Sequence, residues 1–155
     1  MNYSCHGLRD DPLPTGPWKN MPRILIIDDD PQIRSFLRLS LQGAGHEVRT
    51  ASNGAAGLHC ACAEASEGVD LIFCDLFMPG KNGLETIREL TREAPGIPVI
   101  AMSGGGQHGQ VDLLRVARGL GAVSVLAKPF LPAAITKAVR DVLAPPPEQH
   151  KVQPS

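Results

Sequence analysis

The segment Ile24-Leu-Ile-Ile-Asp-Asp-Asp-Pro-Gln-Ile-Arg34 joins a continuous apolar run to three consecutive carboxylates. Four adjacent apolar residues are typical of a strand covered on both faces, as in a parallel sheet. The like charges of Asp28, Asp29 and Asp30 repel one another and favour contact with water. The acidic cluster is therefore either a solvated group that caps a helix or a place where something positive binds.

An apolar run followed by a helical pattern recurs along the chain. Val69–Cys74 and Ile97–Met102 are again nearly continuous, and glycine or Pro-Gly follows several of the helical patterns, as at helix ends. This alternation predicts a doubly wound α/β fold with a parallel sheet. The five expected strand and helix pairs are Arg23–Asp28 with Pro31–Gln42, His46–Thr50 with Ala55–Glu64, Val69–Cys74 with Leu84–Glu93, Ile97–Met102 with Gln110–Arg118, and Ala122–Leu126 with Leu131–Leu143.

Composition limits the class of protein. The chain has 155 residues, of which 43% are hydrophobic and 20% charged, as expected of one globular domain. A formal charge of -1 provides no basic field for nucleic acid or a membrane surface. No run approaches the roughly 20 apolar residues of a membrane span, and the N-terminal stretch lacks the apolar part of a signal peptide. We expect a cytoplasmic protein.

The two ends of the chain differ from its middle. Residues 1–20 and 145–155 are rich in proline and polar residues and have no hydrophobic periodicity. They are expected to be a disordered N-terminal extension and a disordered C-terminal tail around a domain at residues 21–144, with Met21 a candidate natural start.

The four cysteines are Cys5, Cys60, Cys62 and Cys74, and none forms a Cys-x-x-Cys pair. The spacing favours small buried apolar residues over metal ligands or disulfides.

Polar side chains follow the predicted strands at their carboxyl ends, where open α/β sheets bind ligands. Asp28 and Asp29 follow the first strand, whereas Asp75, Ser103 and Lys128 follow the third, fourth and fifth. Carboxylates gathered at one edge suit Mg²⁺, which prefers oxygen ligands. Asp30, next to Pro31 at a helix start, is better suited to N-capping.

A carboxylate beside Mg²⁺ can also act as a nucleophile toward a phosphoryl group. Asp75, alone at the end of its apolar strand, is the candidate. Lys128 would offer a positive charge to the phosphoryl oxygens, and the Ser103 hydroxyl would offer a hydrogen bond. The alternatives are an Asp in a turn, a solvated lysine and a serine in a glycine-rich turn.

Four sequence elements occur in order and register, namely Asp28-Asp29, Asp75-x-x-Met78-Pro79-Gly80 with Gly83, Met102-Ser103-Gly104 and Lys128-Pro129-Phe130. On these elements, residues 22–143 resemble a bacterial response-regulator receiver domain. The resemblance implies a flavodoxin-like five-stranded parallel sheet of order 2-1-3-4-5 with five helices.

The resemblance also implies roles for individual residues. Asp75 would accept phosphate from a histidine kinase or a histidine phosphotransfer protein. Asp29 and Asp75 would ligate Mg²⁺ together with the backbone carbonyl of Phe77, and Asp28 would act chiefly through a bound water. Ser103 and Lys128 would contact the phosphoryl group, and the Lys128–Pro129 peptide bond would be cis. Such a protein is a signalling switch that catalyses its own phosphorylation and dephosphorylation, rather than an enzyme for a separate substrate.

The sequence departs from the family where many members carry Tyr or Phe three residues before the lysine, since Val125 stands there. We therefore expect the output to pass through residues 103–118 instead of an aromatic switch. Phe77 and Gly105 likewise lack the polar side chains that position the hydrolytic water in some relatives. Ile33 could equally be a core residue or part of a kinase-facing patch.

Two other functions share features of this pattern. A dehalogenase-like phosphatase needs a second Asp two residues after its nucleophile, where Phe77 stands. A flavodoxin needs a hydroxyl-rich phosphate loop in place of the acids Asp28 and Asp29. Within the receiver family, the few residues after Leu143 favour a stand-alone switch, with a fragment of a longer regulator as the alternative. The downstream target is expected to be a protein, and the kinase and the signal are open.

Overall fold

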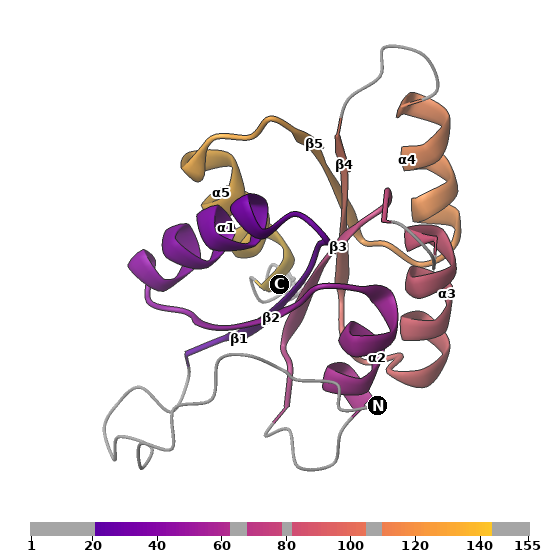
Figure 1. Cartoon of the computed structure of the whole chain (residues 1–155), viewed down its shortest axis with the longest axis horizontal. Helices are drawn as coiled ribbons and strands as arrows, with labels where there is room; N and C mark the ends of the chain where they lie inside the picture. Colours follow the sequence, from indigo (N-terminus) through magenta and orange to yellow (C-terminus); the bar gives the residue numbers. More distant parts are fainter. Residues whose placement is uncertain (1–20, 63–67, 79–81, 105–109, 144–155) are drawn as a thin grey trace, which may run out of the picture.

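The computed structural model describes residues 21–62, 68–78, 82–104 and 110–143, with the side chains of residues 110–114 left out. Within these residues five strands alternate with five helices, as the sequence predicted (Figure 1). Both predicted disordered ends, and the Glu64, Pro79, Gly80 and Gly105 positions, lie outside the described residues. The elements are β1 Arg23–Ile27, α1 Pro31–Gly43, β2 Glu47–Ala51, α2 Gly54–Cys62, β3 Leu71–Asp75, α3 Gly83–Glu93, β4 Val99–Gly104, α4 Gln110–Gly119, β5 Ser124–Lys128 and α5 Pro132–Leu143.

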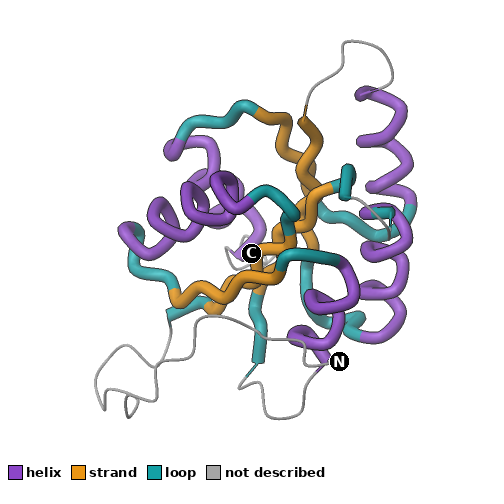
Figure 2. Tube along the Cα trace, viewed as in Figure 1, coloured by secondary structure: helices purple, strands orange, loops and turns teal. Residues whose placement is uncertain are grey.

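The strands form one parallel sheet in the order β2-β1-β3-β4-β5, which confirms the expected topology. Helices α1 and α5 cover one face of the sheet, and α2, α3 and α4 cover the other (Figures 1 and 2). Because all four pairs of neighbouring strands are parallel, the carboxyl ends of the five strands meet at one edge.

Alternate residues of β1 contribute to two cores, one on each face of the sheet. Ile24 and Ile26 pack with Leu37 and Leu41 of α1, whereas Leu25 and Ile27 face the α2 side. All four strand residues are at most 1% exposed, which explains why their sequence is uniformly apolar. Ile33 packs against the first of these cores while partly buried, so the core interpretation accounts for its contact.

The cysteine prediction is wrong in part. Cys74 is buried and free, as expected, but Cys62 is exposed and Cys60 is disulfide-bonded. A disulfide requires two cysteines to approach in space, and spacing along the sequence does not reveal this. In the described part of the chain, no helix combines the length and the apolar character needed to cross a bilayer.

Candidate functional site

Side chains from four strands meet at the carboxyl edge of the sheet. Asp28 directly follows β1, Asp75 ends β3, Ser103 lies in β4 and Lys128 ends β5. The strand register explains their proximity, because Asp75 pairs with Met102, and Gly104, next to Ser103, pairs with Lys128. The sequence prediction that these residues converge is therefore confirmed.

The three consecutive acids have three different environments. Asp28 is fully buried, and its Oδ1 accepts a hydrogen bond from the Asp30 N–H at 2.9 Å. Asp29 is exposed. Asp30 caps α1 as predicted, since its Oδ1 accepts the Gln32 N–H at 2.8 Å, and Pro31 follows in the first turn.

Arg34 is a structural residue that the sequence interpretation missed. Its Nη1 donates to the Asp28 carbonyl oxygen at 2.8 Å and to the Asp29 carbonyl oxygen at 3.0 Å. One side chain from α1 thus holds the backbone of the acidic loop. The available signal was an arginine one helical turn after the N-cap, where its side chain can reach back over the loop.

Asp28, Asp29 and Asp75 form the group of carboxylates that could hold a metal ion. One oxygen from each lies within 4.8 Å of the others. Three anions at this separation repel one another, and a hard divalent cation with oxygen ligands would offset the repulsion. The donor set therefore fits Mg²⁺ and does not fit a metal that prefers thiolate or imidazole.

Lys128 compensates two of these charges. Its Nζ lies 2.8 Å from Asp28 Oδ2 and 3.5 Å from Asp75 Oδ2. Burial lowers the pKa of Lys128, but the hydrogen bond to Asp28 and the charges of Asp28 and Asp75 outweigh this effect and raise the pKa overall. The lysine is consequently a charged ammonium shared by two carboxylates.

Asp75 is only 3% exposed. Burial and the charge of Asp28 raise its pKa from 3.8 to about 6, against the opposing effects of Lys128 and of the Phe77 N–H, which donates to Oδ1 at 3.3 Å. The ionised form of Asp75 is therefore disfavoured in the folded protein, and an additional positive charge nearby would stabilise it.

Ser103 has an unusual hydroxyl group. The residue is fully buried, and its Oγ has no hydrogen-bond partner among the described residues. An unpaired buried hydroxyl is unfavourable, so a group that accepts its hydrogen bond would be stabilised there.

Two glycines permit close approaches around these groups. A Cβ at Gly83 would collide with the Asp75 carbonyl oxygen. The absence of a side chain at Gly83 therefore lets the start of α3 lie directly against the Asp75 backbone. A Cβ at Gly104 would lie 2.9 Å from Lys128 Cδ. The Lys128–Pro129 peptide bond is cis, as the resemblance implied.

The side chains that depart from the receiver pattern lie in different surroundings. The Phe77 side chain is 49% exposed, although its backbone N–H contacts Asp75. Val125 is partly buried and packs against the core on the α2, α3 and α4 side. Neither side chain supplies a polar group to the acidic edge.

Comparisons with known proteins agree on one family. The model of the response regulator receiver domain matches residues 24–140. The transcriptional regulatory protein FixJ of Azorhizobium caulinodans is 39% identical over 128 residues, which are 80% of this chain and 56% of FixJ. The C4-dicarboxylate transport transcriptional regulatory protein DctD of Pseudomonas aeruginosa is 34% identical over 84% of this chain and 27% of DctD. The chain thus spans about a quarter to just over half of the length of these relatives.

Solved structures give the same result. A receiver domain protein from Clostridium thermocellum superimposes with a TM-score of 0.71 at 30% identity and covers 79% of this chain and 94% of its own. The regulator TrrA of Thermotoga maritima, solved in complex with Mg²⁺ and BeF, has a TM-score of 0.66 at 32% identity and covers 79% of this chain and all of its own.

Proposed function

Because this chain belongs to the response regulator receiver family of two-component systems, we propose that it accepts a phosphoryl group on Asp75 in a reaction that requires Mg²⁺. The observation that carries the proposal is the position of the Asp75 carboxylate, buried beside Asp28 and Lys128 in the group that could hold a metal. Mg²⁺, when held by Asp29, Asp75 and the Phe77 carbonyl, with Asp28 acting chiefly through a bound water, would neutralise charge on the phosphoryl donor.

The chain's own residues supply the remaining parts of the reaction. A carboxylate oxygen of Asp75 forms the new P–O bond while the P–N bond of a phosphohistidine breaks, and the leaving imidazole takes up a proton. The Phe77 N–H donates to Asp75 Oδ1, which holds the carboxylate in one orientation. Burial of Asp75 limits access of bulk water to the acyl phosphate.

Lys128 and Ser103 would respond to the added phosphoryl group. The Lys128 ammonium lies 2.8 Å from Asp28 Oδ2 and 3.5 Å from Asp75 Oδ2. Because it is already close to Asp75, it can pair with an oxygen of a phosphoryl group on Asp75 while it stays near Asp28. The unpaired Ser103 hydroxyl would donate to another phosphoryl oxygen. With Val125 at the position of the usual aromatic switch, the displacement would be transmitted through residues 103–118, of which 105–109 lie outside the described residues.

The phosphodonor is proposed to be a histidine kinase or a histidine phosphotransfer protein, and the receiver to act on a protein partner. FixJ and DctD are named transcriptional regulators, and both are longer than the matched region. Their lengths favour a role as the receiver part of a longer regulator at least as much as a stand-alone switch. In the first case the output could reach DNA through another domain, although the -1 net charge of this chain gives it no basic field of its own.

Acetyl phosphate tests the phosphoacceptor without knowledge of the kinase. With Mg²⁺, intact-mass spectrometry should detect one added phosphoryl group that is lost in base. Asp75→Asn should abolish the addition, whereas Asp141→Asn, which changes an exposed carboxylate paired with Lys137, should leave it unchanged. Equal labelling of the Asp75→Asn protein, or equal labelling in EDTA, would contradict the proposal.

A further inference from the structure

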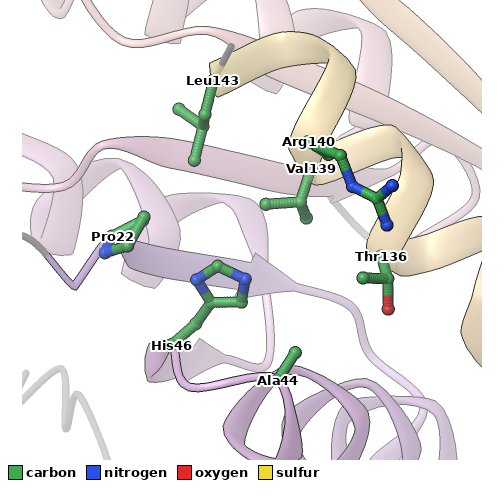
Figure 3. A pocket seen from close by; sticks show the side chains of 7 residues that line it. All are labelled: Pro22, Ala44, His46, Thr136, Val139, Arg140 and Leu143. Atoms are coloured by element: carbon green, nitrogen blue, oxygen red, sulfur yellow. The ribbon is translucent and has the colours of Figure 1, made fainter.

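A cavity of about 350 Å³ lies at the amino edge of the sheet, away from the acidic residues. It is bounded by Pro22 before β1, His46 before β2 and the last two turns of α5 (Figure 3). The volume is within the range of about 300 to 1,000 Å³ that is usual for small-molecule sites. The phosphoacceptor chemistry described above uses none of the residues that line it.

The walls of the cavity are mainly apolar. Val139 is 2% exposed and projects from α5 toward the same space as Leu143 and the Pro22 ring (Figure 3). These side chains would contact the apolar body of a ligand and remove it from water.

Arg140 adds a positive charge to the α5 wall. Its guanidinium forms no ion pair with any carboxylate of the described residues, whereas Lys137 on the same helix pairs with Asp141 at 2.7 Å. An arginine fork without a carboxylate partner is complementary to a carboxylate of the ligand.

His46 provides a second polar group on the opposite wall (Figure 3). Its Nδ1 is buried and has no hydrogen-bond partner in the part of the chain that the structure describes. Burial lowers the pKa of His46 from 6.5, so the imidazole is neutral at pH 7 and can donate one hydrogen bond and accept one. A hydroxyl group can satisfy either ring nitrogen.

We propose that this cavity binds a small organic acid with one carboxylate, which Arg140 holds, an apolar body between Val139 and Leu143, and a hydroxyl group that meets His46. Thr136 completes the polar side, since its hydroxyl donates to the Pro132 carbonyl at 3.0 Å and keeps its oxygen available as an acceptor. The proposal is independent of phosphorylation at Asp75.

The test titrates the full chain with 4-hydroxyphenylacetate and follows backbone amide shifts by NMR. Saturable shifts are expected at residues 136–143 and 44–46. Arg140→Gln should weaken binding about tenfold because a charge-assisted pair is lost. Removing the ligand carboxylate, in 4-hydroxyphenylacetamide, should have a similar effect. Arg118→Gln, at the end of α4 and outside the cavity, is the matched control and should leave affinity unchanged.

The hydroxyl contact is tested with phenylacetate, which should bind about fivefold more weakly than its hydroxylated form, the value of one hydrogen bond. His46→Phe should remove this difference.

The proposed binding site is contradicted by an absence of saturable shifts, by equal affinity for the amide, or by an unchanged affinity in Arg140→Gln. Phosphorylation by acetyl phosphate should be the same in Arg140→Gln as in the natural sequence, which separates this test from that of the proposed function.

Discussion

Lys128 and Asp28 form a buried ion pair between the last strand and the first, with Nζ 2.8 Å from Oδ2 and Asp28 fully buried. The residues are 100 positions apart in the sequence. Their pairing joins β5 to the residue after β1 across the carboxyl edge. Lys128 Nζ lies farther from Asp75 Oδ2, at 3.5 Å, so the charge of Asp75 is compensated more weakly than that of Asp28.

The first prediction concerns this pair. Lys128→Gln should lower the free energy of unfolding by about 2–4 kcal/mol in EDTA, because Asp28 is left buried without its cation. Lys137→Gln, which breaks the exposed pair with Asp141, should change it by less than about 1 kcal/mol. Urea denaturation measures both. Equal effects in the two variants would show that the Lys128 pair contributes no more than a surface pair.

The second prediction concerns Asp75 and pH. An unfolded Asp ionises near 3.8 and the folded Asp75 near about 6, so the folded state binds the proton more tightly. Without metal, the stability of wild type relative to Asp75→Asn should therefore fall by about 1–2 kcal/mol as pH rises from about 4 to about 6. Asp75→Asn should be the more stable protein at pH 7.5.

Urea titrations in EDTA across this range measure the difference between wild type and Asp75→Asn. Mg²⁺ should reduce the difference, since it binds the wild-type site better and stabilises the folded state in proportion to the logarithm of its concentration. A variant that is less stable than wild type at pH 7.5 in EDTA would refute the repulsion argument.

The third prediction separates Ser103 from ordinary core packing. Ser103→Ala should leave the free energy of unfolding equal or raise it by up to about 1 kcal/mol, because it removes a buried hydroxyl that has no described partner.

The same variant should lose the response of residues 103–118 to beryllofluoride and Mg²⁺ in hydrogen exchange. Val125→Ala should retain most of that response. Protection that is confined to the neighbourhood of Asp75 in wild type would argue against transmission through residues 103–118.

The fourth prediction concerns the contact between α3 and the Asp75 backbone. Gly83→Ala should lower the free energy of unfolding by about 2 kcal/mol or more, because the collision with the Asp75 carbonyl exceeds the gain of about 1 kcal/mol in helix propensity. Gly96→Ala, where a Cβ would have no neighbour within 4 Å, is the matched control. Thermal unfolding of both proteins tests the difference, and similar melting temperatures would mean that the backbone adjusts at Gly83.

The sequence predicts the placement of the site well because a parallel sheet imposes it. Once Ile24–Ile27 and Val69–Cys74 are recognised as buried strands, the polar residues after them must share an edge. Element bounds were off by one or two residues, as at β3, which begins at Leu71 and includes Asp75. The ladder with β1 and β4 determines these bounds, and the apolar run alone does not contain it.

Contacts made by long side chains could not be predicted in this way. The reach of Arg34 back to two carbonyls depends on its rotamer. The missing partner of Ser103 Oγ depends on what β4 and its neighbours leave unfilled. The disulfide at Cys60 depends on approach in space. In each case the deciding information is a three-dimensional distance.

The hydrogen bonds from Arg34 to the Asp28 and Asp29 carbonyls have a consequence for the affinity of the site for a cation. The loop is already held in shape by the protein, with Asp28 Oδ1 also bound to the Asp30 N–H. Little chain entropy then remains to be lost on association. More of the attraction between the carboxylates and a divalent cation would then be retained as affinity, and this attraction would weaken as ionic strength rises.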